Sequence, residues 1–176
     1  MHQLNNFQEL FVHELRDLFS AEQQLLTALP KMAQAASSAD LREAFDHHLN
    51  QTRTHVTRLD RIFGQLDTTG AGEECQGMKG LISEGENVIN ANGDSAVKDA
   101  ALIAAAQRVE HYEIAGYGTA RTHAQNLGLD DVASQLQETL DEEGETNKAL
   151  TKISDSVNAD ALAAGEETPV ARKSKK

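Results

Sequence analysis

The sequence has few of the residues that cross-link, anchor or interrupt a protein chain. Its 176 residues include no tryptophan, two prolines and a single cysteine, Cys75. One cysteine excludes a disulfide within the chain and favours a reducing compartment. No apolar run approaches the roughly 20 residues of a membrane-spanning helix, and the first residues, "MHQLNNFQEL", lack the basic and then apolar order of a signal peptide. We therefore expect a soluble cytoplasmic protein with no membrane partner.

Positive charge is also scarce, except at the C-terminus. The chain has 16 Lys and Arg against 28 Asp and Glu, so its formal net charge is −12. An acidic surface disfavours binding to nucleic acid or to anionic membranes, and the sequence therefore argues against nucleic acid as a partner. Four of the basic residues lie in the final segment "ARKSKK". We expect residues 163–176 to form a disordered basic tail with a solvated terminus, and contact between this tail and nucleic acid is the alternative.

The abundant residues favour α-helices. Ala, Leu, Gln, Glu and Lys are common, and long stretches lack helix breakers, as is typical of helical bundles. Apolar residues recur with helical spacing in four stretches, of which the first begins at Leu4. Ser38 and Ser95 are the expected N-caps of the second and third helices. The third helix is expected over about residues 96–126, with Gly128 just after its end.

The connections between these helices predict the topology. The first and last connections are short, whereas residues 67–94 form a long, glycine-rich crossover that favours only one short amphipathic helix. Short connections make neighbouring helices antiparallel, and a long crossover between the second and third helices is found in ferritin-like bundles. The sequence therefore predicts an all-α protein: a ferritin-like four-helix bundle over residues 1–162, with a helix-containing crossover between helices two and three.

Several polar side chains lie on the apolar faces of the predicted helices. Successive residues advance by 100° around a helix, which assigns each polar residue to a face. Each inward polar residue falls near the midpoint of its own helix, and midpoints meet in an antiparallel bundle of equal helices. The sequence therefore predicts one polar layer halfway along the core, formed by Glu22, His48, His55, Glu110, Glu113 and Glu143.

Other polar residues near this height are expected to lie elsewhere. Glu142, His111 and Tyr112 point away from the predicted core, and Arg108 is displaced from it. No lysine lies on the four apolar stripes near the predicted layer. We therefore expect the carboxylates of this layer to have few basic side chains to neutralise them.

Burying such a layer is costly, because an unpaired carboxylate loses several kcal/mol of hydration free energy. Protonation, trapped water or a bound metal ion could compensate. For any one Glu or His, a water-bonded polar group at a helix seam is the simpler interpretation, but acids that converge from separate helices favour a metal. Carboxylate and imidazole ligands suit transition metals, and glutamate-bridged metal pairs occur in di-iron bundles. We predict one or two ions of iron, or of another transition metal such as manganese or zinc.

Four segments carry a resemblance to a known family: "FSAEQQLLTALPKM", "FDHHLNQTRTHVTRLDRIF", "DAALIAAAQRVEHYEIAGYGT" and "LQETLDEE". The chain resembles the YciF/YciE-like family of bacterial ferritin-like proteins over about residues 4–160. The resemblance implies a ferritin-like bundle that forms a homodimer and is linked to the general stress and osmotic response. It also implies candidate metal positions at Glu22, Glu110, Glu113 and Glu143, the acids that the periodicity selects independently.

The second helix departs from the family pattern. The family usually has His-Leu-Glu-Glu-Thr where this chain has "HLNQT" at residues 48–52, so Asn50 and Gln51 replace two acids. His55 stands where a family member has glutamine, and its imidazole can supply a replacement ligand. The chain also has no Glu-x-x-His pair, the signature of the wider di-iron class. One tight site with one weak site, or the loss of a site, are both open.

Two functions follow from these features, and whether the protein is an enzyme stays open. The first is a non-haem metal protein that oxidises Fe(II) with O2 or peroxide and protects a stressed cell, with Tyr117 hydrogen-bonded to a ligand. The second is a non-catalytic dimeric structural or interaction protein whose polar layer only fixes helix packing. Iron storage or DNA protection in a hollow shell is a third, weaker hypothesis, because the net charge disfavours DNA. Cys75 has no nearby histidine in the sequence, which argues against a nucleophile there.

Overall fold

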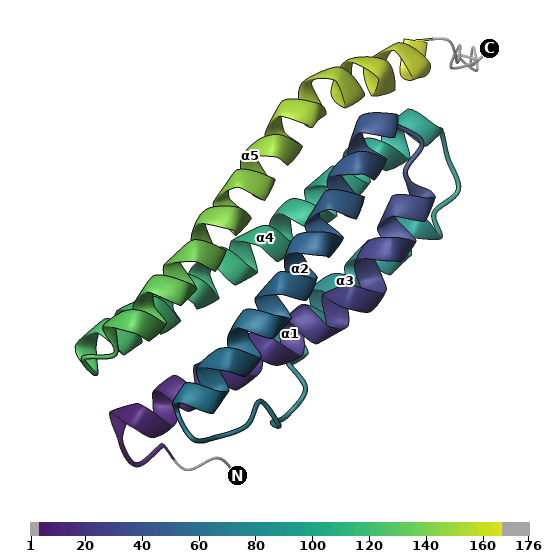
Figure 1. Ribbon diagram of the computed structural model, residues 1–176. Coiled ribbons are helices and arrows are strands. Elements are labelled where there is room, and N and C mark those ends of the chain that lie inside the picture. Colours follow the sequence, from purple (N-terminus) through teal and green to yellow (C-terminus); the bar gives the residue numbers. More distant parts are fainter. Residues whose placement is uncertain (1–3, 167–176) are drawn as a thin grey trace, which may run out of the picture.

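The computed structural model of the chain describes residues 4–166, and all regular elements within them are helices (Figure 1). The helices are α1 (Phe7–Ala35), α2 (Ala39–Gln65), α3 (Gln76–Ile89), α4 (Ser95–Asn126) and α5 (Asp130–Glu166). The short helix α3 lies in the long connection between α2 and α4. The predicted all-α bundle with a helix-containing crossover is therefore confirmed.

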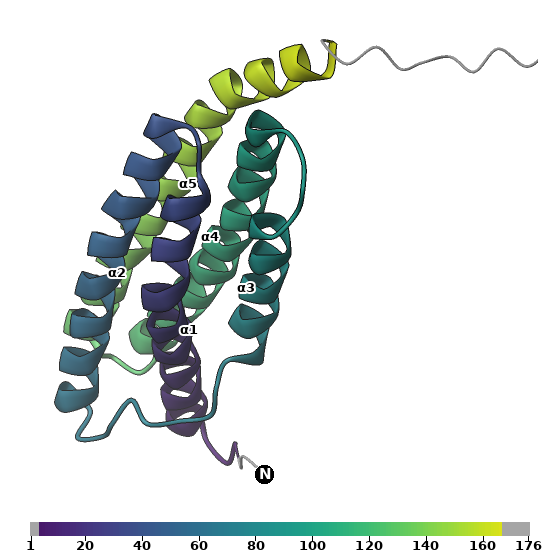
Figure 2. The same cartoon turned by 90° about the vertical axis from the view of Figure 1, so that its right-hand side faces the viewer.

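The four long helices form two hairpins that pack against each other (Figures 1 and 2). Helix α1 pairs with α2 and α4 pairs with α5, while α1 also contacts α4 and α2 contacts α5. Helix α3 packs against α1 and α4 at the side of the bundle (Figure 2). The last part of α5 extends beyond the ends of the other helices (Figure 1). This arrangement brings one central segment of each long helix into the same layer.

The ends of the helices follow from local hydrogen bonds. Ser38 caps α2 as predicted, and Gly128, with φ +71°, follows α4 as predicted. The expected cap at Ser95 is wrong, because Asp94 accepts hydrogen bonds from two backbone N–H groups of the first turn of α4. A carboxylate caps well because it also interacts with the positive end of the helix dipole. Leu4, expected in the first apolar stripe, lies before α1 and is 56% exposed.

The core consists of two apolar clusters with the polar layer between them. One cluster lies toward the α1–α2 turn and includes Leu25, Phe45, Leu102 and Leu150. The other lies toward the α4–α5 turn and includes Phe11, Leu59, Tyr117 and Leu136. Because every long helix contributes to both clusters, the buried polar residues between them sit far from either end of the bundle.

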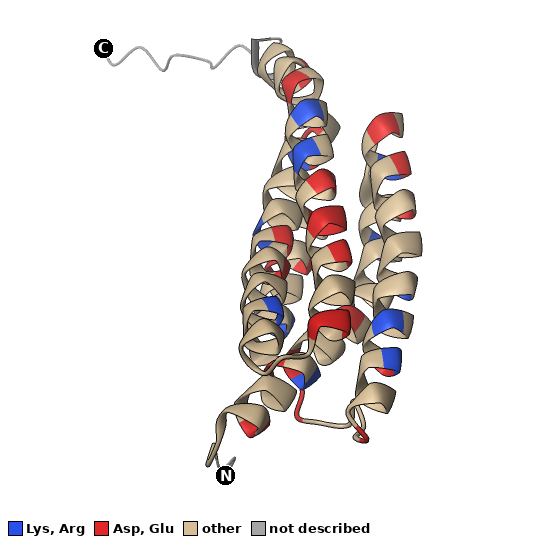
Figure 3. Ribbon diagram, turned by 60° about the vertical axis from the view of Figure 1, so that its left-hand side comes forward, with Lys and Arg blue, Asp and Glu red and all other residues tan. Residues whose placement is uncertain are grey.

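Asp and Glu occur along the length of the bundle, with Lys and Arg between them (Figure 3). None of the helices in residues 4–166 combines the length and the apolar character that crossing a membrane requires. Helix α5 continues to Glu166, past the expected domain boundary at residue 162. Residues 167–176 of the expected basic tail lie outside the described residues, so that tail stays a prediction.

Candidate metal centre

The polar layer contains all six residues that the sequence predicts there. Helix α1 contributes one of them, α2 two, α4 two and α5 one. Their exposed fractions are 0% for Glu22, His55, Glu113 and Glu143, and 2% for His48 and Glu110. The structure thus brings the six side chains together in the buried interior, while their role as metal ligands stays a prediction.

The six side chains divide into two sets that share Glu143. His48, Glu110, Glu113 and Glu143 form the first set, called here the His48 group, and Glu22, His55 and Glu143 form the second, called the His55 group. Within each group the possible ligand atoms all lie within 4.8 Å of one another. The two imidazole ring centroids are 6.3 Å apart. The layer therefore offers two neighbouring positions for a cation, with one carboxylate between them.

Most of the potential ligand atoms in this layer are not used by the protein. Among the described residues, both oxygens of Glu113 and both of Glu143 have no hydrogen-bond partner. The same holds for Oε2 of Glu22, Oε2 of Glu110, Nε2 of His48 and Nδ1 of His55. Each unsatisfied buried polar atom costs about 1–3 kcal/mol, so a set of this size needs an explanation. Cations at the two positions, with oxygen and nitrogen ligands, would give these atoms partners.

The two histidines face the carboxylates with different nitrogens. His48 Nε2 lies 3.4 Å from Glu110 Oε1 and 3.7 Å from Glu143 Oε2. His55 Nδ1 lies 3.0 Å from Glu143 Oε1 and 3.3 Å from Glu22 Oε1, at angles that leave this nitrogen without a hydrogen bond. Both rings thus present one nitrogen to the interior of the layer, as a metal ligand does.

Burial controls the protonation of the carboxyl groups. Burial raises the pKa values of Glu110 and Glu113 well above their usual range, and the nearby charge of Glu143 adds to the effect. Although burial also acts on Glu143, its pKa is lowered because His55 and His48 stabilise its charged form. Without a metal, Glu110 and Glu113 therefore favour the neutral acid and Glu143 the carboxylate.

His48 and His55 titrate in opposite directions. Burial lowers the pKa of His48 and favours its neutral, ligand-competent form. Burial also disfavours the charged form of His55, but the carboxylates of Glu143 and Glu22 outweigh it and raise the pKa of His55 to about 10. The His55 imidazolium is therefore a positive charge inside the layer of the metal-free protein.

Tyr117 holds one ligand candidate in place. Its fully buried hydroxyl donates a hydrogen bond to Oε1 of Glu22. Its ring also makes an edge contact with the His55 ring. The predicted hydrogen bond between Tyr117 and a candidate ligand is therefore present, and it leaves Oε2 of Glu22 free.

Two residues outside the predicted layer lie behind His55: Glu142 contacts its ring, and Arg58 contacts Glu142. Glu142, expected to point away, lies with Oε2 2.9 Å from Nε2 of His55. Arg58, which is absent from the predicted layer, is 7% exposed and donates to Oε2 of Glu142 at 2.8 Å. The spacing contained a signal, because Arg58 follows His55 by three residues and so shares its face of α2.

The outer nitrogen of His48 has a neutral partner. His48 Nδ1 lies 3.3 Å from the hydroxyl oxygen of Thr146, which can accept its N–H. Gln51, where the resembled family has an acid, accepts a hydrogen bond from the same hydroxyl. The amide at this position is therefore used to support Thr146 on α5.

Tyr112 and Cys75 form a separate cluster outside the layer. The hydroxyl of Tyr112 donates to Asp17 on α1 and lies 3.0 Å from Sγ of Cys75. This placement agrees with the prediction that Tyr112 points away from the six-residue layer. Burial raises the pKa of the Cys75 thiol, which favours the less nucleophilic protonated form.

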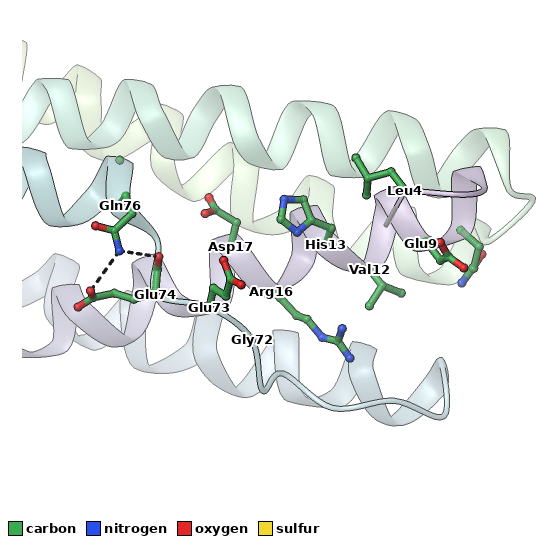
Figure 4. A pocket seen from close by; sticks show the side chains of 12 residues that line it. Leu4, Glu9, Val12, His13, Arg16, Asp17, Gly72, Glu73, Glu74 and Gln76 are labelled. Carbon is green, nitrogen blue, oxygen red and sulfur yellow. Dashed lines mark hydrogen bonds between the residues drawn. The ribbon is translucent and has the colours of Figure 1, made fainter. Parts of the chain in front are cut away.

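A surface cleft of about 490 Å³ lies between the first turns of α1 and residues 72–77 (Figure 4). Glu9, His13, Arg16 and Asp17 line it from α1, and Glu74 and Gln76 line it from the opposite side. None of the six layer residues lines this cleft. The candidate metal centre and the cleft are therefore separate features.

Comparison with known proteins identifies close relatives. Residues 6–163 match the family described as Domain of unknown function (DUF892). The chain is 43% identical over 151 residues to Protein YciF of Escherichia coli (strain K12), covering 85% of this chain and 91% of that protein. The crystal structure of the E. coli stress protein YciF matches with a TM-score of 0.86 and 42% identity over 88% of this chain and 98% of that one. The resemblance to YciF-like proteins is therefore confirmed.

Two further solved structures support the fold. YcfI from Rhodopseudomonas palustris matches with a TM-score of 0.83 and 40% identity, over 85% of this chain and 96% of that chain. A ferritin-like, diiron-carboxylate protein from Bacillus anthracis str. Ames matches with a TM-score of 0.66 over 85% of this chain and 99% of that chain. Its identity is only 13%, so this likeness concerns the fold alone. The predicted ferritin-like bundle is confirmed.

Proposed function

This chain belongs to the DUF892 family, and we propose that in this member the polar layer binds one or two transition-metal ions, iron first among them, for redox chemistry with O2 or peroxide. The observation that carries the proposal is the set of buried atoms that have no hydrogen bond among the described residues. Imidazole and carboxylate donors together suit iron, manganese and zinc. A metal ion would bind the buried oxygen and nitrogen atoms that have no hydrogen-bond partner among the described residues.

The residues of the chain would hold the ions and orient their ligands. Glu110 and Glu113, one turn apart on α4, belong to the His48 group, and Glu143 belongs to both groups. Tyr117 fixes one oxygen of Glu22 and leaves the other free. The apolar clusters on both sides keep bulk water out of the layer. Bound iron would supply the electrons for the reduction of O2 or peroxide as Fe(II) becomes Fe(III).

The two groups are unequal as metal sites. The His48 group offers four possible ligand residues, whereas the His55 group offers three and shares one of them. More ligands of the same kind give a tighter site, so the His48 group is the tighter site of this proposal. The sequence of α2 leaves two arrangements open: one tight site with one weak site, or the loss of a site. This assignment is the first of them.

The test is anaerobic loading of tag-free protein with Fe(II), followed by exposure to air or hydrogen peroxide. The expected result is one or two iron ions per chain by elemental analysis and ferric absorbance after oxidation. Glu113→Gln is expected to lower the bound iron, because it replaces a carboxylate of the tighter site. Glu145→Gln is the matched control, because Glu145 is 71% exposed on α5 and pairs with Lys148. If wild-type protein neither binds Fe(II) nor develops ferric absorbance, the proposal is wrong.

The positive charge of His55 favours a second function, in which the layer has a structural role. His55, with its pKa of about 10, can form ion pairs with carboxylates of the layer in the absence of metal. The layer would then only fix the packing of a non-catalytic structural or interaction protein. This alternative predicts that no metal ion raises the thermal unfolding temperature, whereas a metal site predicts a rise, because the ion binds only the folded state.

The proposal also covers the cellular process, the compartment and the oligomeric state of the protein. Since the related E. coli YciF is described as a stress protein, we place this chain in the stress response of the cytoplasm, as a homodimer. Light scattering of purified protein tests the assembly, with a dimer expected. A shell of 12 or more chains would instead support the third hypothesis, iron storage.

A further inference from the structure

The two ring nitrogens of His55 have different surroundings. Nδ1 faces the interior of the layer, within 3.3 Å of oxygens of Glu22 and Glu143 but without a hydrogen bond. Nε2 faces the α2–α5 seam and lies 2.9 Å from Oε2 of Glu142. Glu142 Oε2 is within hydrogen-bonding distance of Nε2 and can accept its hydrogen, whereas Nδ1 makes no hydrogen bond to the two carboxylates near it. With Nε2 as the donor, Nδ1 is the nitrogen left to bind a cation.

Glu142 is itself held from the other side by Arg58. The guanidinium donates from Nη1 to Oε2 of Glu142 at 2.8 Å and from Nη2 to Oε1 at 3.5 Å. Arg58 is in turn fixed by a hydrogen bond to the Thr139 hydroxyl and by an ion pair with Glu138 at 3.2 Å. The carboxylate of Glu142, 30% exposed, therefore has little freedom to leave His55.

The outer ring nitrogens of His48 and His55 have partners of different charge. His48 Nδ1 faces the neutral hydroxyl of Thr146, whereas His55 Nε2 faces a carboxylate. A carboxylate partner makes an imidazole a stronger ligand and fixes its tautomer and ring orientation. The stronger support thus lies behind the group that has fewer ligands of its own.

From these contacts we infer that Glu142 and Arg58 are positioning residues of the His55 group: together they hold the hydrogen of the His55 ring on Nε2 and thereby direct Nδ1 at a metal ion shared with Glu22 and Glu143. This inference rests on the proposed metal-binding function. It adds two residues from the α2–α5 seam that the ligand set does not contain.

The experiment uses Zn(II), which is diamagnetic and has no redox chemistry, on the full chain. In ¹⁵N-labelled wild-type protein loaded with zinc, NMR is expected to show a hydrogen on Nε2 of His55 and none on Nδ1. The His55 signals are assigned by their absence from a His55→Gln variant. A hydrogen on Nδ1, or a His55 ring without bound zinc, would overturn the inference, and this readout needs no variant of Glu142 or Arg58.

Variants test the same point through affinity. Glu142→Gln is expected to weaken zinc binding at the His55 group about 10- to 100-fold, the usual effect of losing such an outer partner. Arg58→Lys, which loses the two-pronged contact, is expected to act in the same direction. Glu145→Gln removes the same charge from an exposed position of α5 and is expected to leave zinc affinity near that of wild type. Circular dichroism confirms that each variant is folded.

The outcomes separate this inference from the proposed function. If wild-type protein binds zinc and iron but Glu142→Gln behaves like Glu145→Gln, the positioning role is wrong and the metal site stands. If wild-type protein binds neither metal, both fail. A Thr146→Val variant, which removes the hydroxyl that lies beside His48 Nδ1 and Gln51, is expected to weaken the His48 group and to spare the His55 tautomer.

Discussion

The hydroxyl of Tyr117 on α4 donates a hydrogen bond to Oε1 of Glu22 on α1, at 2.5 Å and with both side chains fully buried. This contact joins the two helical hairpins at the polar layer. It also gives one oxygen of a candidate ligand a fixed partner, while the other oxygen has none among the described residues. The stability of the protein and the geometry of the site thus depend on the same bond.

Tyr117→Phe is expected to destabilise the metal-free protein by about 1–3 kcal/mol, because Oε1 of Glu22 loses its partner in a site that water does not reach. Urea denaturation measures the free energy of unfolding. The control is Tyr112→Phe, which removes a hydroxyl from a half-buried site where solvent can reach Asp17, and it is expected to cost less. Equal losses in both variants would contradict the importance assigned to the Tyr117–Glu22 bond.

Glu110→Gln is expected to keep or raise the stability of the metal-free protein, because burial already favours the neutral form of Glu110. In the presence of metal, the variant is expected to lose much of the stabilisation that wild type shows. At a free metal concentration of 100 times the Kd, this stabilisation is about 2.7 kcal/mol. Thermal unfolding with and without zinc measures both quantities. An unchanged metal response in Glu110→Gln would remove Glu110 from the ligand set.

The stability of the metal-free protein is expected to fall as pH rises from about 6.5 toward 10. His55 has a pKa of about 10 in the folded protein and about 6.5 in an unfolded chain. The folded state thus holds this proton more tightly, and the stabilisation is complete below the unfolded pKa and lost as pH rises through the folded one. Denaturation at several pH values tests this, and a His55→Gln variant should have a flatter profile in the same range.

Metal binding is expected to change with pH in the opposite sense. Glu110, Glu113 and His55 hold protons in the metal-free protein, and a metal ion must displace these protons from its ligands. Zinc affinity should therefore rise with pH, and binding should release protons into a weakly buffered solution. Zinc titration at two pH values, with proton release followed by a pH indicator, provides the measurement. Binding without proton release would show that these groups are not the ligands.

Asp99→Ala is expected to destabilise the protein by about 3 kcal/mol, because it removes a buried carboxylate with three hydrogen bonds. Asp99 is 2% exposed and accepts from the backbone N–H groups of Ser37 and Ser38 and from the Ser37 hydroxyl. These bonds tie α4 to the α1–α2 turn. The control Asp94→Ala removes an exposed helix cap and should cost about 1 kcal/mol, so similar values for the two would contradict the anchoring role of Asp99.

Much of the candidate site was predictable, because the geometry of an α-helix is fixed by its backbone. The angle of 100° per residue places Glu22, His48 and Glu143 on inward faces wherever their helices pack. Their mid-helix positions give the same height in any antiparallel bundle with a topology like this one. The two acids of "VEHYE" in α4 could be assigned in the same way, since they are one turn apart.

The partners of these residues could not be predicted in the same way. Arg58 lies at the edge of its apolar stripe, and only the register of α2 against α5 decides that its long side chain meets Glu142. Asp99 reaches the α1–α2 turn only because the crossover places the first turns of α4 beside it. Asp94 and Ser95 are both residues that can cap the start of α4. A small difference in energy decides which of the two side chains does so.

The sequence by itself therefore determined the helices, their connections and which side chains turn inward, because these depend on backbone periodicity and on short-range turn chemistry. Only the tertiary structure decided which atoms face one another across the helices, that Glu143 serves both histidines, and that Glu142 and Arg58 stand behind His55. The reason is physical: contacts between helices depend on their axial register and on the reach of flexible side chains, and both are set by packing the whole core at once.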